Sequence, residues 1–275
     1  MKKFSIVSML SVFALPAIAA ESNTQLPHGL QLGLGMSATS GLNMFVGYNN
    51  KNLNSFWAKR FGVRLDFATY SPIKNRFNKE LNSAIGEDGY KVSDTIKLQD
   101  FELDGYHYGA IVDFYPFGDT WFFGGWRISA GYMRGELNAS AAPWSERLDG
   151  NLVRFYLDDW MLFYNGGQML ARGKVDWKYS GPYLGTGFDL GIFAGFKMFV
   201  DAGVVVANKT PNVNLDVPLD GLMRIEDNNL VFVKDNEKAY NNFKTGYDAA
   251  LASARNEVKD YKYYPMVKMG FMYRF

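Results

Sequence analysis

The sequence of 275 residues contains no cysteine and only two histidines, His28 and His107. Without cysteine the chain cannot form disulfides, thiolate metal sites or a lipid anchor on an N-terminal cysteine. Neither histidine has a second metal ligand at the spacing of a helix or a short loop. We therefore expect no metal ion and no cofactor.

An excess of charge of one sign is also missing. The 29 basic and 28 acidic residues nearly balance and leave a formal net charge of +1. A protein that grips nucleic acid by its phosphates carries a clear basic excess or a basic face. The composition therefore predicts no nucleic acid partner.

Long apolar runs are absent after the first twenty residues. The nearest candidate, residues 192–207, contains Lys197 and Asp201, and each charge would cost about 2.5–3.5 kcal/mol near the centre of a lipid-embedded helix. A period of two removes the conflict, because Val200 and Val204 then lie on one face and the two charges on the other. One apolar face opposite a face of polar and small residues is typical of a transmembrane β-strand.

The same alternation recurs along the chain. It predicts strands at residues 29–38, 41–49, 56–70, 96–115, 121–140, 171–188, 195–208 and 261–275. Most strand glycines and charges fall on the polar face, where a narrow barrel needs small side chains. We expect an all-β fold, namely a single antiparallel transmembrane β-barrel of about eight strands. A soluble β-sandwich is the alternative, because its strands also alternate while its apolar face forms the core.

The connections between these strands differ in length. An even number of strands puts both termini on the periplasmic side and alternates short turns with long outer loops. The long connections are residues 71–95, 141–170 and 209–260, whereas the Ala38–Ser40 link is brief for an outer loop. Residues 236–259 repeat apolar side chains at steps of three and four and predict a short amphipathic helix in the last loop. This helix either packs over the barrel mouth or binds a partner or a membrane surface.

The first twenty residues have the organisation of an export signal. Two lysines precede an apolar stretch from Phe4 to Leu15, and Ala19 supplies a small residue at a cleavage position. The stretch is shorter than the roughly 20 residues that a spanning helix needs. We expect residues 1–20 to be a cleaved signal peptide and residues 21–275 to form the barrel.

The last predicted strand carries an uninterrupted outward series of apolar and aromatic residues. Its members are Val267, Met269, Phe271, Tyr273 and Phe275. Here the sequence resembles small Gram-negative outer-membrane barrels of the OmpA- and OmpW-like class. Through Tyr115–Gly118, Arg127–Gly131 and Gly181–Gly185 it also resembles a poorly characterised proteobacterial group.

The resemblance implies a place in the bacterial outer membrane, in contact with outer-membrane lipid and lipopolysaccharide. It also implies that the barrel-assembly machinery reads the outward series of the last strand as an assembly signal. It implies no catalytic residues.

The inner face of the predicted barrel collects the strand charges. They are Arg64, Asp66, His107, Asp113, Arg127, Lys197, Asp201 and Lys268. Isolated charges in a narrow interior are costly, so pairing is expected. The paired charges would plug the lumen, or they would line a narrow polar path for ions or a small solute.

Catalysis finds little support in the sequence. His107 could meet Asp66 or Asp113 inside the barrel, and a serine nearby would complete the groups of a lipid hydrolase. Acyl chains, however, lie on the opposite, lipid-facing side of the wall. We do not expect an enzyme. Two functions stay open: a structural or surface-interaction barrel with an unidentified surface ligand, and a channel or transporter for a small or hydrophobic solute.

Overall fold

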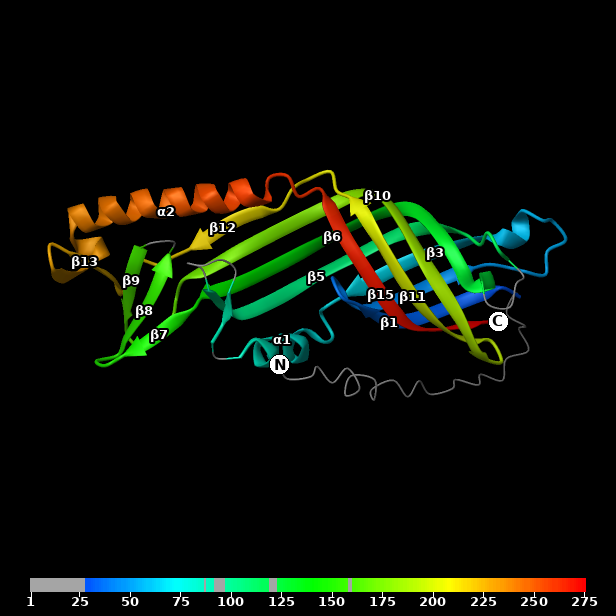
Figure 1. Cartoon of the computed structure of the whole chain (residues 1–275), viewed down its shortest axis with the longest axis horizontal. Coiled ribbons are helices and arrows are strands. Elements are labelled where there is room, and N and C mark those ends of the chain that lie inside the picture. Colours follow the sequence, from blue (N-terminus) through cyan, green and yellow to red (C-terminus); the bar gives the residue numbers. More distant parts are fainter. Residues whose placement is uncertain (1–27, 87, 92–96, 119–122, 158–159) are drawn as a thin grey trace.

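The structure is a computed structural model that describes residues 28–275 apart from residues 87, 92–96, 119–122 and 158–159. The predicted signal peptide lies outside the described residues. The chain is elongated, with a ring of strands at one end and a smaller sheet with a long helix at the other (Figure 1). Of the helices in the described part, none is long and apolar enough to cross a membrane.

Within the described residues, eight antiparallel strands pair into a ring. They are β1 (Leu30–Ser37), β2 (Gly41–Tyr48), β3 (Phe61–Thr69), β5 (Lys97–Phe114), β6 (Trp126–Pro143), β10 (Arg172–Phe193), β11 (Phe196–Val206) and β15 (Tyr263–Arg274). Strands that follow one another in this series are hydrogen-bonded neighbours, and β15 pairs with both β11 and β1. The predicted all-β fold with about eight barrel strands is confirmed.

The faces of the ring strands follow the predicted period of two. On β3, Leu65 is 68% exposed while its neighbour Arg64 is 3% exposed. The same contrast separates Val200 from Asp201 on β11. A soluble sandwich would bury the apolar face and expose the charged one. Here the apolar face is exposed and the charged face is buried. The sandwich alternative is therefore wrong.

Inward glycines make room for large rings inside the ring of strands. A Cβ atom built on Gly203 would lie 2.5 Å from a ring carbon of Tyr183, which projects inward from the neighbouring strand β10. Such a contact is far below van der Waals distance, so only glycine fits there. The small residues on the inner face thus determine which aromatic side chains can fill the interior.

The brief link after β1 is compatible with the first predicted hairpin. Ser37 pairs with Gly41 across the turn, and Gly41 has φ +82°, a conformation that favours glycine. Two other strand starts were predicted too early. Residues Ala58–Arg60 and Phe123–Gly125 form short 3₁₀ helices, so β3 begins at residue 61 and β6 at residue 126.

The regions predicted as outer loops contain a second sheet, which corrects that expectation. Its strands are β7 (Ser145–Leu148), β8 (Leu152–Leu157), β9 (Trp160–Asn165), β13 (Leu222–Glu226) and β14 (Asn229–Phe232), in the order β14-β13-β9-β8-β7. A further strand, β12 (Asn212–Asp216), pairs with the first residues of β10. Strands of four to six residues are too short for an alternation to be recognised in the sequence.

The predicted helix in the last long connection is present as α2 (Glu237–Val258). It begins where the Asn236 side chain accepts a hydrogen bond from the amide of Ala239. It packs over the second sheet and β12, not over the barrel mouth: Phe243 joins the core of that sheet, and Tyr247 donates to the carbonyl of Leu215 at 2.6 Å. We call the second sheet, β12 and α2 the outer module.

A second helix, α1 (Lys74–Ile85), and the two-residue strand β4 (Tyr90–Lys91) lie in the first long connection, where only a loop was predicted. The amide side chains of Asn78 and Asn82 each bond both a backbone N–H and a carbonyl of β5, at Leu103 and Phe101. These bonds satisfy β5 where its pairing with β6 is irregular. The helix is polar and therefore gave no apolar period to recognise.

Candidate functional site: a charge network inside the barrel

One cluster of charges lies in the part of the barrel nearer the short turns. Arg64 contacts Asp113 through Nε at 2.6 Å and donates to Asp201 at 2.9 Å. Arg127 donates to the other oxygen of Asp201 at 2.6 Å and also pairs with Asp189. Two guanidinium groups thus bind three carboxylates, and all five side chains are at most 5% exposed.

The bond between Arg64 and Asp201 spans the whole interior. In the ring, β3 and β11 are separated by β2, β1 and β15 on one side and by β5, β6 and β10 on the other. The two residues therefore project from opposite walls and meet. A side chain that crosses the full width at one level leaves little room for water beside it.

A second cluster lies closer to the outer module. Lys268 contacts Asp66 with an Nζ–Oδ1 distance of 2.5 Å, and Asn43 donates to the same oxygen at 3.1 Å. His107 places Nε2 at 3.0 Å from Asp66 and Nδ1 at 2.7 Å from the hydroxyl of Ser40. Each of these groups is at most 3% exposed.

Ser40, His107 and Asp66 therefore stand in line as hydroxyl, imidazole and carboxylate. A nucleophilic triad has the same groups, but it needs the hydroxyl open to a substrate carbonyl. Here the Tyr264 hydroxyl lies 3.3 Å from the Ser40 oxygen, and Lys268 already binds the carboxylate. The arrangement pairs these buried polar side chains with one another.

An aromatic layer lies above the second cluster. Tyr264 stacks on Tyr179 with ring centroids 4.1 Å apart, and Trp177 meets Tyr264 edge-on at 5.3 Å. Trp177 also donates from its indole N–H to the carbonyl of Lys209 at 2.8 Å. These rings separate the second cluster from the outer module.

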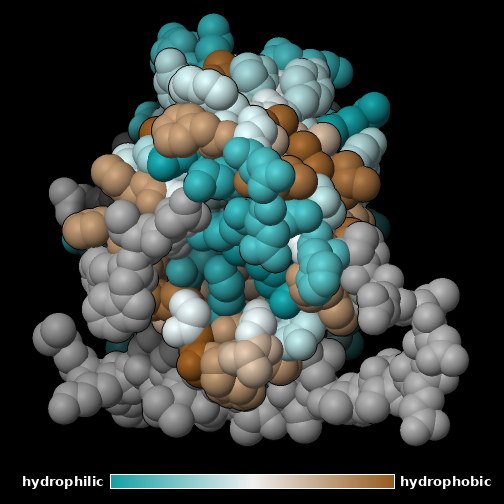
Figure 2. Space-filling model, turned by 90° about the vertical axis from the view of Figure 1, so that its right-hand side faces the viewer, coloured by the Kyte–Doolittle hydropathy of each residue, from teal (hydrophilic) through white to brown (hydrophobic). Residues whose placement is uncertain are grey.

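Of the eight predicted interior charges, seven lie in the two clusters. Lys197 does not, and within the described residues it forms no ion pair. Lys197 is the second residue of β11 and therefore lies at the short-turn end of the ring. Seen from that end, the molecule has hydrophilic residues at its centre and hydrophobic residues beside them (Figure 2). Gln31 and Arg274 face each other across β1 and β15 at the same end.

The network also contains residues that the sequence did not indicate. Asp189 binds Arg127 and accepts a hydrogen bond from Tyr115 at 3.1 Å, and Ser129 donates to Asp113 at 2.6 Å. Asp189 lies one residue beyond the predicted end of its strand, at residue 188. Continuing the inward alternation from Gly187 would have placed it inside.

The outer wall of the ring is apolar. Its exposed side chains include Leu32, Met44, Val46, Val63, Leu65, Phe67, Val112, Ile128, Leu184, Val200, Val267 and Met269. An apolar exterior around a charged interior is the arrangement of a transmembrane β-barrel, and it defines the class of protein to which this fold corresponds.

The outward series on β15 is part of this apolar outer wall, as predicted. Val267, Met269 and Phe271 are exposed, and Tyr273 packs edge-on against Phe275 with centroids 4.7 Å apart. Phe275 donates its backbone N–H to Leu30 at 2.9 Å, next to the closing pair of strands. Its role as an assembly signal stays a prediction.

Comparison with known proteins gives likeness of shape only. No family model and no curated protein matches the chain. CarO and CarO2 of Acinetobacter baumannii are each similar to it at 16% identity and a TM-score of 0.48, over 92% of this chain and 100% of theirs. A major outer membrane protein from Thermus thermophilus is similar at 14% identity and a TM-score of 0.39, over 90% of this chain and 98% of that one. None of the three bears the name of an OmpA- or OmpW-like protein, so that finer assignment stays a prediction.

Proposed function

We propose that the protein is an integral outer-membrane β-barrel with a closed lumen, whose role is to hold the outer module at the cell surface. In this role the barrel anchors the protein in the membrane, and the outer module is exposed at the cell surface. Outer-membrane lipid, lipopolysaccharide and the barrel-assembly machinery are its proposed partners, together with a surface ligand that remains to be found.

The composition of the outer wall supports the membrane location. Its exposed apolar band ends in aromatic side chains, with Phe117 and Phe193 at the short-turn end and Tyr106 and Tyr108 at the other. Aromatic girdles of this kind mark the two interfaces of a transmembrane barrel. The long strands β5, β6 and β10 have 18, 18 and 22 residues. Each is longer than the roughly 9–11 residues that a β-strand needs to cross a bilayer.

The orientation follows from the lengths of the connections. Short turns and both ends of the barrel sequence lie at one end of the ring, and the outer module lies at the other (Figure 1). Outer-membrane barrels have short periplasmic turns and longer outer loops. The outer module is therefore proposed to face outward.

The observation that carries the closed lumen is the contact between Arg64 and Asp201. It joins opposite walls, and Arg127 and Asp113 occupy the same level. A buried ion pair of this kind is costly to open, because each separated charge would lose its partner in a poorly solvated site. An eight-stranded ring is in any case just wide enough for side chains to fill it.

We infer that Ser40 has no catalytic role and that the protein is not an enzyme. Ser40 is 2% exposed and lies under the Tyr264 hydroxyl. A fluorophosphonate probe that reacts with activated serines should therefore leave the folded protein unlabelled. Labelling that disappears in His107→Ala would contradict this inference.

Efflux from liposomes tests the closed lumen. Vesicles that contain the folded protein should retain a small charged solute such as glutamate as well as protein-free vesicles do. The double variant Arg64→Ala/Asp201→Ala removes the crossing side chains and should release the solute. Rapid loss through the unmodified protein would instead favour the channel function.

A further inference from the structure

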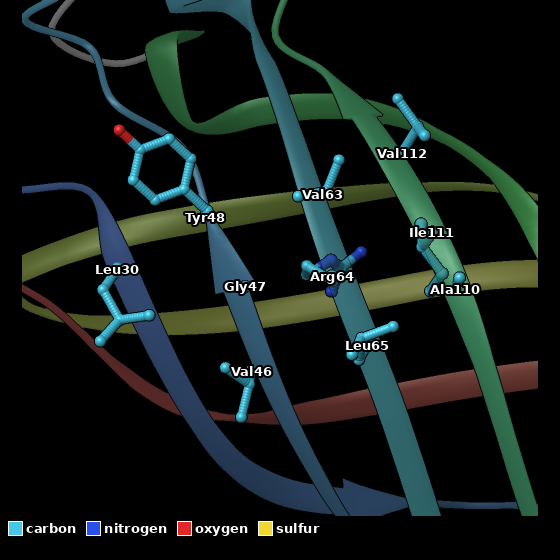
Figure 3. A pocket seen from close by; sticks show the side chains of 10 residues that line it. All are labelled: Leu30, Val46, Gly47, Tyr48, Val63, Arg64, Leu65, Ala110, Ile111 and Val112. Carbon is cyan, nitrogen blue, oxygen red and sulfur yellow. The ribbon is translucent and has the colours of Figure 1, made fainter. Parts of the chain in front are cut away.

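The outer wall of the barrel carries two adjoining hollows. The first, of about 470 Å³, is lined by residues of β1, β2, β3 and β5, and the second, of about 660 Å³, by residues of β3, β5 and β6. Both hollows are lined by Leu65 and Ala110. Figure 3 shows the first hollow, in which Val46, Val63 and Val112 stand along the strands around it. Ala110 pairs with Leu65 across β3 and β5, and its single methyl group leaves the space between larger neighbours open. We call the two hollows together the outer-wall groove.

The groove ends beside a charged residue, Arg134 on β6. Tyr108 lies directly across from Arg134 on β5, and Tyr132 precedes it on the same face; all three line the second hollow. Arg134 is eight residues beyond Trp126, the first residue of β6. On a strand tilted by about 40° this places it about 20 Å higher, near the far edge of an apolar band about 25 Å tall.

Arg134 is exposed, and within the described residues it forms no ion pair. An exposed guanidinium near the edge of an apolar band costs only about 0–1 kcal/mol, and without an ion pair of its own among these residues Arg134 is available to bind an anion from the surroundings. Its planar fork matches a phosphate group with two parallel hydrogen bonds. Lys178 on the neighbouring strand β10 has a side chain that is 71% exposed and lies 3.8 Å from Glu136, so a second cation faces the same side.

We propose that the outer-wall groove is a binding site for lipid A, the phosphorylated anchor of lipopolysaccharide. One phosphate binds Arg134, and an acyl chain lies in the groove over Ala110 and Leu65. The proposal rests on the proposed function, because the outward orientation of the outer module puts Arg134 in the outer leaflet. The lipid of that leaflet that combines phosphates with several acyl chains is lipid A.

Native mass spectrometry of the full chain in lipid nanodiscs tests the proposal. The probe is diphosphoryl lipid A, compared with dephosphorylated lipid A and with phosphatidylglycerol. Arg134→Gln should weaken retention of diphosphoryl lipid A by about tenfold, because it removes a charge-assisted pair, and should leave dephosphorylated lipid A unchanged. Ala110→Trp fills the groove and should weaken retention of both forms.

Two matched variants serve as controls. Arg172→Gln removes an arginine that already pairs with Glu102 at 3.4 Å, and Ala202→Trp enlarges an exposed residue on β11, on the opposite wall. Both should retain lipid A as the unmodified protein does. Equal retention by Arg134→Gln, or retention of phosphatidylglycerol as strong as that of lipid A, would overturn the proposal. A barrel that inserts normally but retains no lipid A contradicts this site alone, whereas failure to insert would contradict the proposed function.

Discussion

Arg64 on β3 donates a hydrogen bond of 2.9 Å to Asp201 on β11, the strand directly opposite in the ring. Asp201 also accepts from Arg127. One carboxylate thus binds two guanidinium groups in the interior. Its removal would leave each of these buried positive charges without one of its negatively charged partners.

We expect Asp201→Ala to lower the free energy of unfolding by about 3–5 kcal/mol, as when one partner of a buried ion pair is removed. Urea unfolding in lipid vesicles, followed by tryptophan fluorescence, measures the change. Asp216→Ala is the control, because Asp216 pairs with Lys174 in an exposed position with 55% of its side chain accessible. That change should be below about 1 kcal/mol. Equal losses in the two variants would show that the interior pairs do not stabilise the barrel.

The two faces of β11 predict opposite labelling. Val200 is 36% exposed on the outer wall, and Val205 is fully buried inside the ring. In Val200→Cys a lipid-soluble thiol probe should react readily, and in Val205→Cys it should not. The chain has no other cysteine, so each signal reports one position. Equal reaction at both positions would reject the assignment of faces.

The outer module should respond to overpacking independently of the barrel. A Cβ atom on Gly246 of α2 would lie 2.7 Å from the indole of Trp160. Gly246→Leu should therefore destabilise the module by about 1–3 kcal/mol, and limited proteolysis should cut it faster. Ala249→Leu changes an exposed position of the same helix and should leave the cleavage rate unchanged. Faster cleavage within the ring strands as well would show that the two parts unfold together.

The ring strands could be predicted because each is long and separates lipid-facing from interior residues without exception along its middle. On β3, four apolar residues alternate with Gly62, Arg64, Asp66 and Ala68, and burial follows this alternation. The short strands of the outer module offer no such contrast. Phe163 and its neighbours Leu162 and Tyr164 on β9 are all buried, so successive residues do not alternate.

The interior site could be predicted as a set of residues but not as a set of contacts. Alternation shows that Arg64 and Asp201 face inward, yet they are 137 residues apart. Which charges meet depends on the stagger of the strands around the closed ring, and no local pattern encodes it. For the same reason the sequence did not indicate that Ser40, in the turn after β1, would meet His107 on β5.

The outward series on β15 predicts a role in assembly. Phe275→Ala should reduce the amount of folded protein in outer-membrane fractions several-fold, because the assembly machinery would recognise the strand less well. The folded fraction should unfold at nearly the same urea concentration as the unmodified protein. Phe271→Ala, within the same series, provides the comparison. Normal assembly of Phe275→Ala would show that the resemblance to an assembly signal is misleading.

Conductance across a planar lipid bilayer tests the central claim most directly. Arg64, Arg127, Asp113 and Asp201 fill one level of the interior, and each is at most 3% exposed. The unmodified protein should therefore insert at neutral pH without stable conductance, while Arg64→Ala/Asp201→Ala should open steps of current. Steady, porin-sized conductance from the unmodified protein would contradict the closed lumen.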